Sequence, residues 1–256
     1  MKIRVWSDLH IDGAAFAQGE ACRKNPACKE ETLVLAGDTS NSVNATIQYA
    51  NSMASSFKYV VVVLGNHEFY KGMPYSAIDT LSGTTSHNVY LLNKDSVLLD
   101  DVMFIGATLW TDFHNDPRVE VAAQQSINDF NLMYVNANDK VTPLWMRKKF
   151  KEEFEYIKTM VRDCYDKSVV VTHFPPLRRF QHPRWGSVNQ NPLNAYFMTN
   201  NEEIYDWTFD AWICGHTHDP SYFSEVGQKF VCNPRGYAYR GKNENAEFDP
   251  DLILEI

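Results

Sequence analysis

Short, continuously apolar runs alternate along the chain with longer segments in which apolar residues recur every three or four positions. The short runs read as β-strands, and those that are apolar throughout are typical of strands covered on both faces of a sheet. The runs are KIRVWS, TLVLAG, YVVVVLG, VYLL, VMFIGAT, SVVVTH, AWICG, YFSEV, KFVCN and LILEI. A further run, SVLLD, meets VMFIG at Asp100 and Asp101, which predicts a β-hairpin.

Two segments between these runs have the spacing of amphipathic helices. Apolar residues repeat at three and four positions over residues 43–57, and Ser42 or Asn41 could cap the start of that helix. A second helix has Thr142 as its N-cap and Pro143 at its first position, and an apolar stripe follows.

A third helix is predicted from Asp116 towards Leu132. Strand and helix alternate as far as residue 173, and strands dominate from there to the end. This mixture predicts an α/β layered sandwich, in which two sheets pack together and helices lie outside. The length of 256 residues fits one large domain, and we expect a single domain over residues 1–256. The longest stretch without a clear pattern is 174–200, and loops of that length are usually functional or disordered.

Composition and charge narrow the class of protein. The apolar fraction of 44% and the charged fraction of 22% are ordinary for a globular protein. The net charge of −8 disfavours long nucleic acids as partners, because proteins that grip a phosphate backbone usually have a basic face. A local cationic site, such as a metal, could still attract a phosphate.

The cysteines and the hydropathy pattern indicate a cytoplasmic protein. The five cysteines, which include Cys22, form no pair with zinc-ligand spacing and read as reduced thiols. The N-terminus has no long apolar stretch, so we expect no signal peptide. No segment approaches the ~18 apolar residues of a membrane span, so we expect no membrane partner. The oligomeric state is left open.

Five of the strand-like runs end in polar side chains that could form one site. The carboxyl ends of strands in an α/β sheet are where ligands gather. Five of the eight histidines fall within these motifs, which makes coincidence a poor explanation. The residues are Asp8 and His10 in SDLH, Asp38 and Asn41 in AGDTSN, Asn66, His67 and Glu68 in GNHE, His173 in VTH, and His216 and His218 in CGHTH.

In order and spacing these motifs resemble the calcineurin-like metallophosphoesterase superfamily. The pattern is D-x-H, G-D-x-x-N, G-N-H-E, a lone histidine after a strand, and G-H-x-H, and it extends from Asp8 to His218. The segment VCNPRGY, residues 231–237, resembles the one that follows the last metal motif in many bacterial and phage members. The resemblance implies a calcineurin-like four-layer sandwich of two mixed β-sheets packed face to face and flanked by helices.

The resemblance also implies two divalent metal ions bridged by one carboxylate. The first ion would be held by Asp8, His10, Asp38 and His218. The second would be held by Asp38, Asn66, His173 and His216. Carboxylate, amide and imidazole ligands without a thiolate suit manganese, which we favour, and also iron, zinc, nickel and cobalt.

The implied reaction is hydrolysis of a phosphoester by attack of a metal-bound hydroxide. Asp38 and His67 are the expected catalytic residues, with His67 protonating the leaving oxygen or stabilising its charge. Glu68 either orients His67 from behind or is a solvated loop carboxylate. Asn41 is expected to organise the Asp38 loop, because its amide can cap the helix that begins there.

Residues 174–200 follow His173 and should overhang the site in part. Four basic residues of this segment could meet a phosphate: Arg178, Arg179, His182 and Arg184. Phe180 and Trp185 could stack on a base. The alternative is a solvated loop with its aromatic residues against the core. Many family members have a second histidine where this chain has Phe174, so no role is inferred there.

The sequence therefore predicts a dinuclear-metal phosphoesterase acting on a small phosphoester, with a phosphodiester or nucleotide favoured. One alternative is a phosphomonoesterase or protein phosphatase of the same fold. Another is a catalytically silent metal-binding scaffold, which would have no need of His67 and the complete ligand set.

Overall fold

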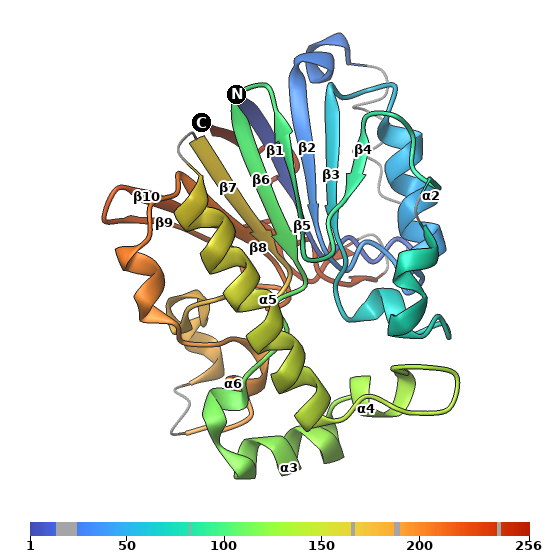
Figure 1. Cartoon of the computed structure of the whole chain (residues 1–256), viewed down its shortest axis with the longest axis vertical. Helices are drawn as coiled ribbons and strands as arrows, with labels where there is room; N and C mark the ends of the chain where they lie inside the picture. The colour runs from blue at the N-terminus through green and yellow to red at the C-terminus, as the bar shows by residue number, and fades with distance from the viewer. Residues whose placement is uncertain (14–24, 82, 165–166, 187–189, 240–241) are drawn as a thin grey trace.

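Two mixed β-sheets packed face to face form the centre of the computed structural model (Figure 1). The structure describes residues 1–13, 25–81, 83–164, 167–186, 190–239 and 242–256, so Cys22 lies outside the described residues. The first sheet has the order β13 (Ile253–Glu255), β1 (Lys2–Trp6), β2 (Glu31–Ala36), β3 (Tyr59–Val63) and β4 (Val89–Leu91). The second has the order β5 (Asp95–Leu99), β6 (Val102–Ala107), β7 (Lys167–Thr172), β8 (Ala211–Cys214), β10 (Gln228–Cys232) and β9 (Ser221–Glu225).

The first sheet is parallel except for β13 at one edge, and the second is parallel except for β5 and β9 at its two edges. Strands β1 to β4 are parallel and β13 is antiparallel to β1. Strands β6, β7, β8 and β10 are parallel, while β5 and β9 run antiparallel to their neighbours. The predicted hairpin is the β5–β6 pair. In Figure 1 the parallel strands of both sheets run in the same direction, so their carboxyl ends lie at the same edge of the molecule.

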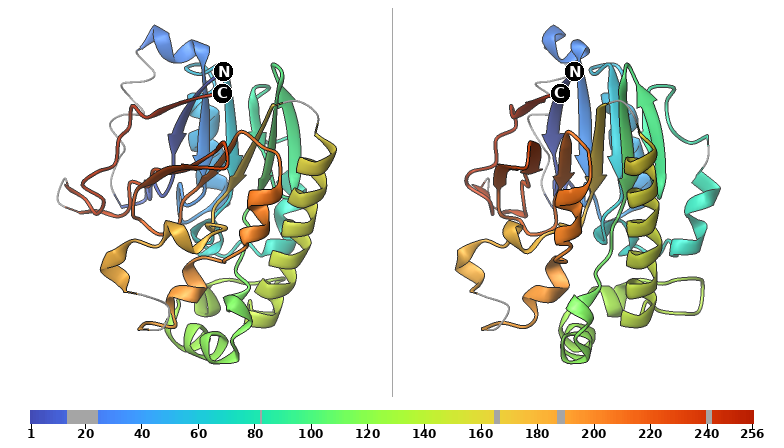
Figure 2. Two further views of the ribbon diagram at one scale, coloured as in Figure 1. Left: turned by 90° about the vertical axis from the view of Figure 1, so that its left-hand side faces the viewer. Right: turned by 60° about the vertical axis from the view of Figure 1, so that its left-hand side comes forward.

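The apolar strand YVVVV shows why the sheets are layered. Val61 and Val63 belong to the core between the two sheets, whereas Val60 and Val62 pack under α2 (Val43–Met53). Successive side chains on a strand point to opposite faces, so a strand covered on both sides must be apolar throughout. On the other side, α5 (Pro143–Asp163) covers the second sheet (Figures 1 and 2). The predicted four-layer α/β sandwich is confirmed.

The predicted first residues of the helices agree with the structure better than their predicted last residues. In α5 the Thr142 side chain accepts a hydrogen bond from the Trp145 N–H at 3.2 Å, as an N-cap should. Helix α2 begins after Ser42, without a side-chain cap, and ends at Met53 before the last apolar position of the repeat.

The third predicted helix is divided in two. Helix α3 (Pro117–Ser126) ends at Ile127, which is extended, and α4 (Asp129–Leu132) is a single turn. The break turns Asp129 inward, where three side-chain donors meet its carboxylate. The sequence pattern indicated neither the break nor the burial of Asp129.

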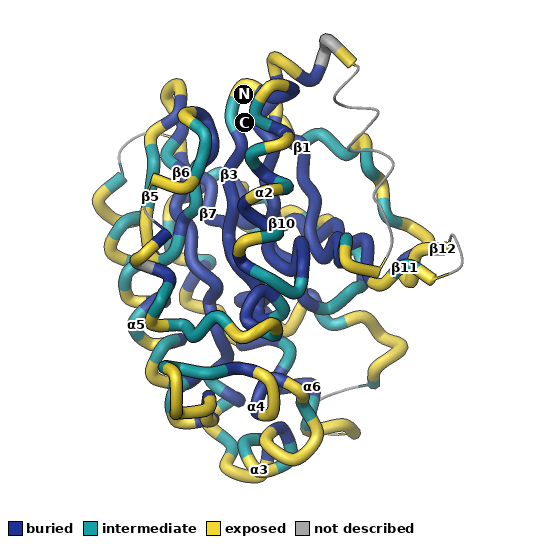
Figure 3. Tube along the Cα trace, turned by 90° about the vertical axis from the view of Figure 1, so that its right-hand side faces the viewer, coloured by how far each residue is buried: buried dark blue, intermediate teal, exposed yellow. Residues whose placement is uncertain are grey.

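The two chain ends lie close together, and the central strands are buried while the last hairpin is exposed (Figure 3). Pairing of β1 with β13 brings both chain ends to the same end of the molecule (Figure 2). Figure 3 shows β1, β3, β7 and β10 buried along most of their length, while β11 (Ala238–Tyr239) and β12 (Lys242–Asn243) form an exposed hairpin at the periphery. None of the described helices combines the length and the apolar character that a membrane crossing requires.

A buried carboxylate, Glu68, ties together the loops that follow β2 and β3. Its Oε2 accepts from the backbone N–H of Asp38 at 3.0 Å and of Gly65 at 2.7 Å. Its Oε1 accepts from Thr39 N at 2.7 Å, Ser40 N at 3.2 Å and the Thr46 hydroxyl at 2.9 Å. Burial and the nearby Asp38 raise the pKa of Glu68 to about 7 against the effect of these bonds.

Both sequence-based expectations for Glu68 are therefore wrong. The side chain is fully buried, so it is not a solvated loop carboxylate, and its bonds go to the Asp38 loop rather than to His67. The short 3-10 turn η2 (His67–Phe69) directs the two neighbouring side chains to different places. Glu68 holds the backbone on which the site is built.

Substitution Glu68→Gln should lower the free energy of unfolding by about 2–4 kcal/mol, because the amide nitrogen faces backbone N–H donors and leaves buried groups unpaired. Urea unfolding followed by far-UV circular dichroism measures this change. Glu155→Gln, on the exposed face of α5, is the matched control and should shift stability by no more than about 0.5 kcal/mol. Equal stability of the two variants would contradict the role given to Glu68.

Candidate metal centre

The side chains singled out in the sequence meet at the carboxyl edge of the two sheets. They come from the loops after β1, β2, β3, β7 and β8. Among the described residues, three groups of side chains could each hold a metal ion, because within each group the ligand atoms all lie within 4.8 Å of one another. The groups are Asp8 with His10 and His218, Asp38 with His173 and His216, and His10 with Asp38 and His67.

The group around His173 brings acceptor atoms face to face. The Nδ1 of His173 lies 3.0 Å from the Ala36 carbonyl, which can only accept, so Nδ1 carries the proton of the neutral ring. Nε2 then points its lone pair at Asn66 Oδ1 and His216 Nδ1, both at 3.1 Å, and at Asp38 Oδ2 at 3.4 Å. Such a cluster of acceptors requires a positive charge among them.

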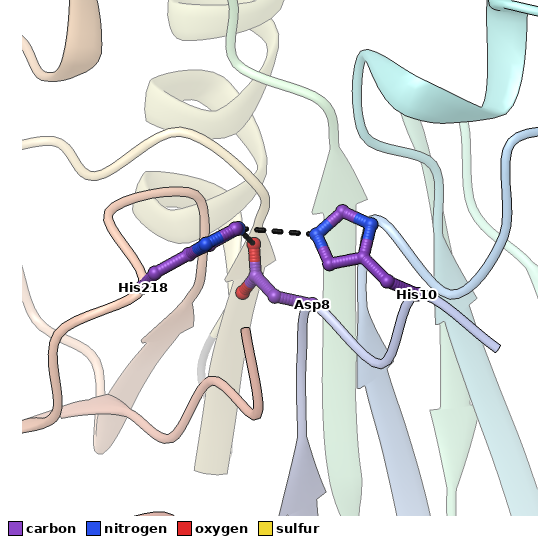
Figure 4. A group of neighbouring side chains, drawn as sticks. All are labelled: Asp8, His10 and His218. Carbon is purple, nitrogen blue, oxygen red and sulfur yellow. Dashed lines mark hydrogen bonds and ion pairs between the residues drawn. The ribbon is translucent and has the colours of Figure 1, made fainter. Parts of the chain in front are cut away.

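The group around His218 repeats this arrangement (Figure 4). His218 Nδ1 lies 2.7 Å from Glu244 Oε2, so its proton is on that side. The opposite nitrogen, Nε2, faces His10 Nε2 at 3.1 Å and Asp8 Oδ1 at 3.5 Å. The carboxylate of Asp8 is held in place by the His216 N–H, at 2.9 Å from Oδ1.

The pKa values at the site shift in both directions: burial lowers the pKa of His10 to about 3 and that of His216 well below its usual range, whereas His173 and Asp38 are shifted towards their charged forms. Burial lowers the pKa of His173, but Asp38 and Asp8 outweigh it and bring the pKa to about 10. Burial raises the pKa of Asp38, but His173 and His67 outweigh it and hold the pKa well below its usual range. The donor set of carboxylates, imidazoles and one amide oxygen therefore fits a divalent cation in each group.

The backbone at the site is held in an uncommon conformation. Five of the predicted ligands have left-handed φ angles: Asp8, His10, Asp38, His216 and His218, at 52°, 42°, 53°, 73° and 55°. Such angles are unusual for residues other than glycine and cluster at functional sites. Gly65 allows the close approach of two loops, because a Cβ there would lie 2.1 Å from Asp38 Oδ1 and 2.7 Å from His173 Nε2.

His67 lies beside these groups with both ring nitrogens engaged. Nδ1 lies 2.8 Å from Asn41 Oδ1, so Asn41 orients the ring, whereas the sequence predicted a helix cap. Nε2 lies 3.9 Å from Asp38 Oδ2 and 3.2 Å from the Tyr237 hydroxyl. The imidazole thus presents Nε2 to the same space as the metal-ligand groups.

Asp129 is a site residue that the sequence did not reveal. Its buried carboxylate accepts from the side-chain amide of Asn66 at 2.9 Å and from the hydroxyls of Tyr70 and Tyr196. Because the amide nitrogen of Asn66 faces Asp129, its oxygen must face His173. No motif marks Asp129, since its partners lie far away in the sequence.

A cavity of about 450 Å³ opens directly onto the two groups. Its walls are aromatic and amide side chains, and within the described ranges no lysine or arginine lines it. Besides residues of the metal-ligand groups, the lining includes Tyr70, Asn128, Asp129, Gln181, His182, Trp185, Asn191, Asn194, Tyr196, Phe197, Tyr237 and Glu244.

The arginines of segment 174–200 do not reach this cavity. Arg178 and Arg179 line a separate cavity, and Arg184 is paired with Asp219 at 2.8 Å. Phe180 is buried in the core and cannot stack on a ligand, so that expectation is wrong. Trp185 does line the cavity beside the metal-ligand groups. Residues 187–189 of the segment lie outside the described residues.

Comparisons with known proteins agree with this geometry. The family model of calcineurin-like phosphoesterases matches residues 1–220. A protein of Acanthamoeba polyphaga mimivirus, named "Uncharacterized protein L509", is 27% identical over 278 residues, which cover 98% of each chain.

Two solved structures are similar in fold. Phosphopantetheinyl hydrolase from Mycobacterium tuberculosis has a TM-score of 0.73 at 17% identity, with 92% of this chain and 89% of that chain covered. A dimetal phosphatase from Danio rerio has a TM-score of 0.51 at 14% identity, with 91% of this chain and 86% of that chain covered. These two likenesses concern the fold alone. The family match shows that the chain belongs to the calcineurin-like phosphoesterases and, with the candidate metal-ligand groups, that it is a metal-dependent phosphoester hydrolase.

Proposed function

We propose that this enzyme hydrolyses a small phosphoester, preferring a phosphodiester or nucleotide to a phosphoprotein. The observation that carries the proposal is the position of the cavity: acceptor clusters at one end and walls without lysine or arginine among the described residues. A dianionic monoester needs cationic groups around its terminal oxygens. A diester has one negative charge and an organic group on each side, which aromatic walls accommodate.

We assign the metal ligands to the two acceptor clusters. Asp8, His10, Asp38 and His218 would hold the first divalent ion. Asp38, Asn66, His173 and His216 would hold the second, so Asp38 is shared. Manganese remains our preferred metal, on the chemistry of these donors.

The residues around the metal centre would have different roles in hydrolysis. When bound, the two ions supply Lewis acidity that draws charge from the phosphoryl group and acidifies water. His67, whose Nδ1 is fixed by Asn41, would give a proton from Nε2 to the leaving oxygen. Asp38 lies next to His67, with its Oδ2 3.9 Å from the Nε2 of the ring. Trp185, which is exposed on the cavity wall, would pack against the organic part of the substrate, whereas Tyr196 is fully buried behind that wall.

These observations favour the diesterase over the two alternative functions, a monoesterase or protein phosphatase and a silent metal-binding scaffold. A monoesterase or protein phosphatase would gain from the arginines of segment 174–200, which are engaged elsewhere. A silent scaffold would not need an oriented His67. We also propose that residues 1–256 form one domain, since β13 joins the first sheet while β9 and β10 join the second. A cytoplasmic location stays a prediction.

The substrate proposal is tested with manganese-loaded protein. We expect kcat/KM for bis-p-nitrophenyl phosphate to exceed that for p-nitrophenyl phosphate and for a phosphopeptide. Phosphopantetheine belongs in the panel because a structure of similar fold is named for a phosphopantetheinyl hydrolase. A tenfold or greater preference for the monoester or the phosphopeptide would contradict the proposal.

Substitution Asp38→Asn should remove or loosen both metal ions, whereas His10→Ala should mainly weaken one. A shared carboxylate neutralises two cations, so its loss affects both sites. Metal content of the purified variants, measured by mass spectrometry after gel filtration, decides this. Two tightly held ions in Asp38→Asn would show that the ligand assignment is wrong.

Substitution His67→Gln should reduce kcat by ~10²–10⁴-fold with metal content close to wild type, the range for loss of a general acid. The loss should be smaller for esters of nitrophenol than for alkyl esters, because a good leaving group needs little protonation. His87→Gln, an exposed histidine, is the control and should leave kcat unchanged. An equal loss for good and poor leaving groups would point to a positioning role.

A further inference from the structure

The chain continues beyond the family match and returns to the metal centre. The matched region ends at residue 220, and the hairpin of β11 and β12 follows β10. At the base of this hairpin the Glu244 N–H donates to the Tyr237 carbonyl at 2.7 Å. In turn, the Tyr237 N–H donates to Glu244 Oε2 at 3.2 Å. Tyr237 and Glu244 are therefore fixed relative to each other.

The same base is tied to the loop that carries Asp8 and His10. The Arg235 N–H donates to the Ser7 carbonyl at 3.0 Å, and its guanidinium donates to the Leu9 carbonyl at 2.9 Å. Arg235 is buried, although it lies next to an exposed hairpin. These bonds place Tyr237 and Glu244 beside the first metal-ligand group, although both residues are partly exposed to solvent.

Glu244 acts on the orientation of one predicted ligand. Its carboxylate lies 2.7 Å from His218 Nδ1, and this contact leaves the opposite nitrogen of the ring aimed at His10 and Asp8. A carboxylate behind a ligating histidine fixes the tautomer and strengthens the ligand. No other described side chain is within hydrogen-bond distance of His218 Nδ1.

Tyr237 stands between the first metal-ligand group and the cavity. Its ring centroid lies 4.4 Å from that of His10 and 4.9 Å from that of His218. Its hydroxyl reaches His67 Nε2 at 3.2 Å, and the side chain is half exposed on the cavity wall. If His67 gives its proton to a leaving oxygen, the hydroxyl beside it must face the phosphoryl group.

We propose that Tyr237 and Glu244, at the base of this hairpin, are part of the active site. In it Glu244 positions His218 for the first metal ion, and the Tyr237 hydroxyl donates a hydrogen bond to a phosphoryl oxygen of the substrate. A neutral donor at this place suits the single negative charge of a diester. This inference rests on the proposed function, whose substrate recognition it extends.

The proposed role of Glu244 is tested on manganese-loaded protein, without any assay of activity. Glu244→Gln should lose one of its two manganese ions to EDTA ~10–100-fold faster than wild type, while the second ion leaves at the wild-type rate. Glu247→Gln, a carboxylate three residues away, is the control and should match wild type. Wild-type retention of both ions in Glu244→Gln would overturn this part of the proposal.

The proposed role of the Tyr237 hydroxyl is tested with the variant Tyr237→Phe, which keeps the ring and removes the hydroxyl. We expect inorganic phosphate to inhibit or bind ~10–100-fold more weakly, and kcat/KM for bis-p-nitrophenyl phosphate to fall by a similar factor, with metal content unchanged. Tyr222→Phe, an exposed tyrosine of β9, is the control. Because the hydroxyl would contact the phosphoryl group, the loss should be equal for good and poor leaving groups.

Two results would overturn the role of Tyr237. Phosphate affinity and kcat/KM within twofold of wild type would show that the hydroxyl does not contact the phosphoryl group. A loss confined to poor leaving groups would show that it acts only through His67. If the wild-type protein hydrolysed no phosphoester, the proposed function would fail, but EDTA release and phosphate binding would still decide the roles of Glu244 and Tyr237.

Discussion

The crowding of acceptor atoms at the edge of the two sheets is the constraint on which the rest of the structure depends. His173 Nε2 faces an amide oxygen, a second imidazole nitrogen and a carboxylate, and His218 Nε2 faces a similar set. Without positive charge these groups would repel one another and remain unpaired in a buried place. In the metal-free protein a proton on His173 can supply this charge, which the high pKa of its ring reflects. Divalent ions would satisfy the same demand at both clusters.

Holding these atoms together requires backbone that the ordinary conformational preferences of the chain oppose. Five predicted ligand residues have left-handed φ angles, and the loops of Asp38 and Gly65 approach too closely for a side chain at residue 65. Glu68 offsets this cost with four hydrogen bonds to the loops after β2 and β3 and a fifth to Thr46 of α2. The sheets supply the rest, because strands apolar on both faces are locked between two layers.

What could be predicted from the sequence was local. The strand YVVVV, the Thr142 cap and the motif residues are each determined by a few neighbouring positions. Glu68 was misjudged because adjacency to His67 suggested a shared role, whereas a 3-10 turn separates their directions. Asp129 and Glu244 could not be found, and Tyr237, although it ends the segment VCNPRGY, could not be given a role, since their partners are 63, 26 and 170 residues away in the chain. The arginines of segment 174–200 were placed near the substrate from sequence proximity alone, and tertiary packing directs them elsewhere.

The central claim is that one carboxylate, Asp38, joins two cations in a single centre. Titration of the metal-stripped protein with Mn²⁺, followed by electron paramagnetic resonance at low temperature, tests it most directly. At two equivalents per chain we predict a spin-coupled spectrum, because a bridging ligand places the ions ~3.5–4 Å apart. Saturation at one equivalent, or the six-line signal of isolated Mn²⁺ persisting to two equivalents, would contradict a bridged dinuclear centre.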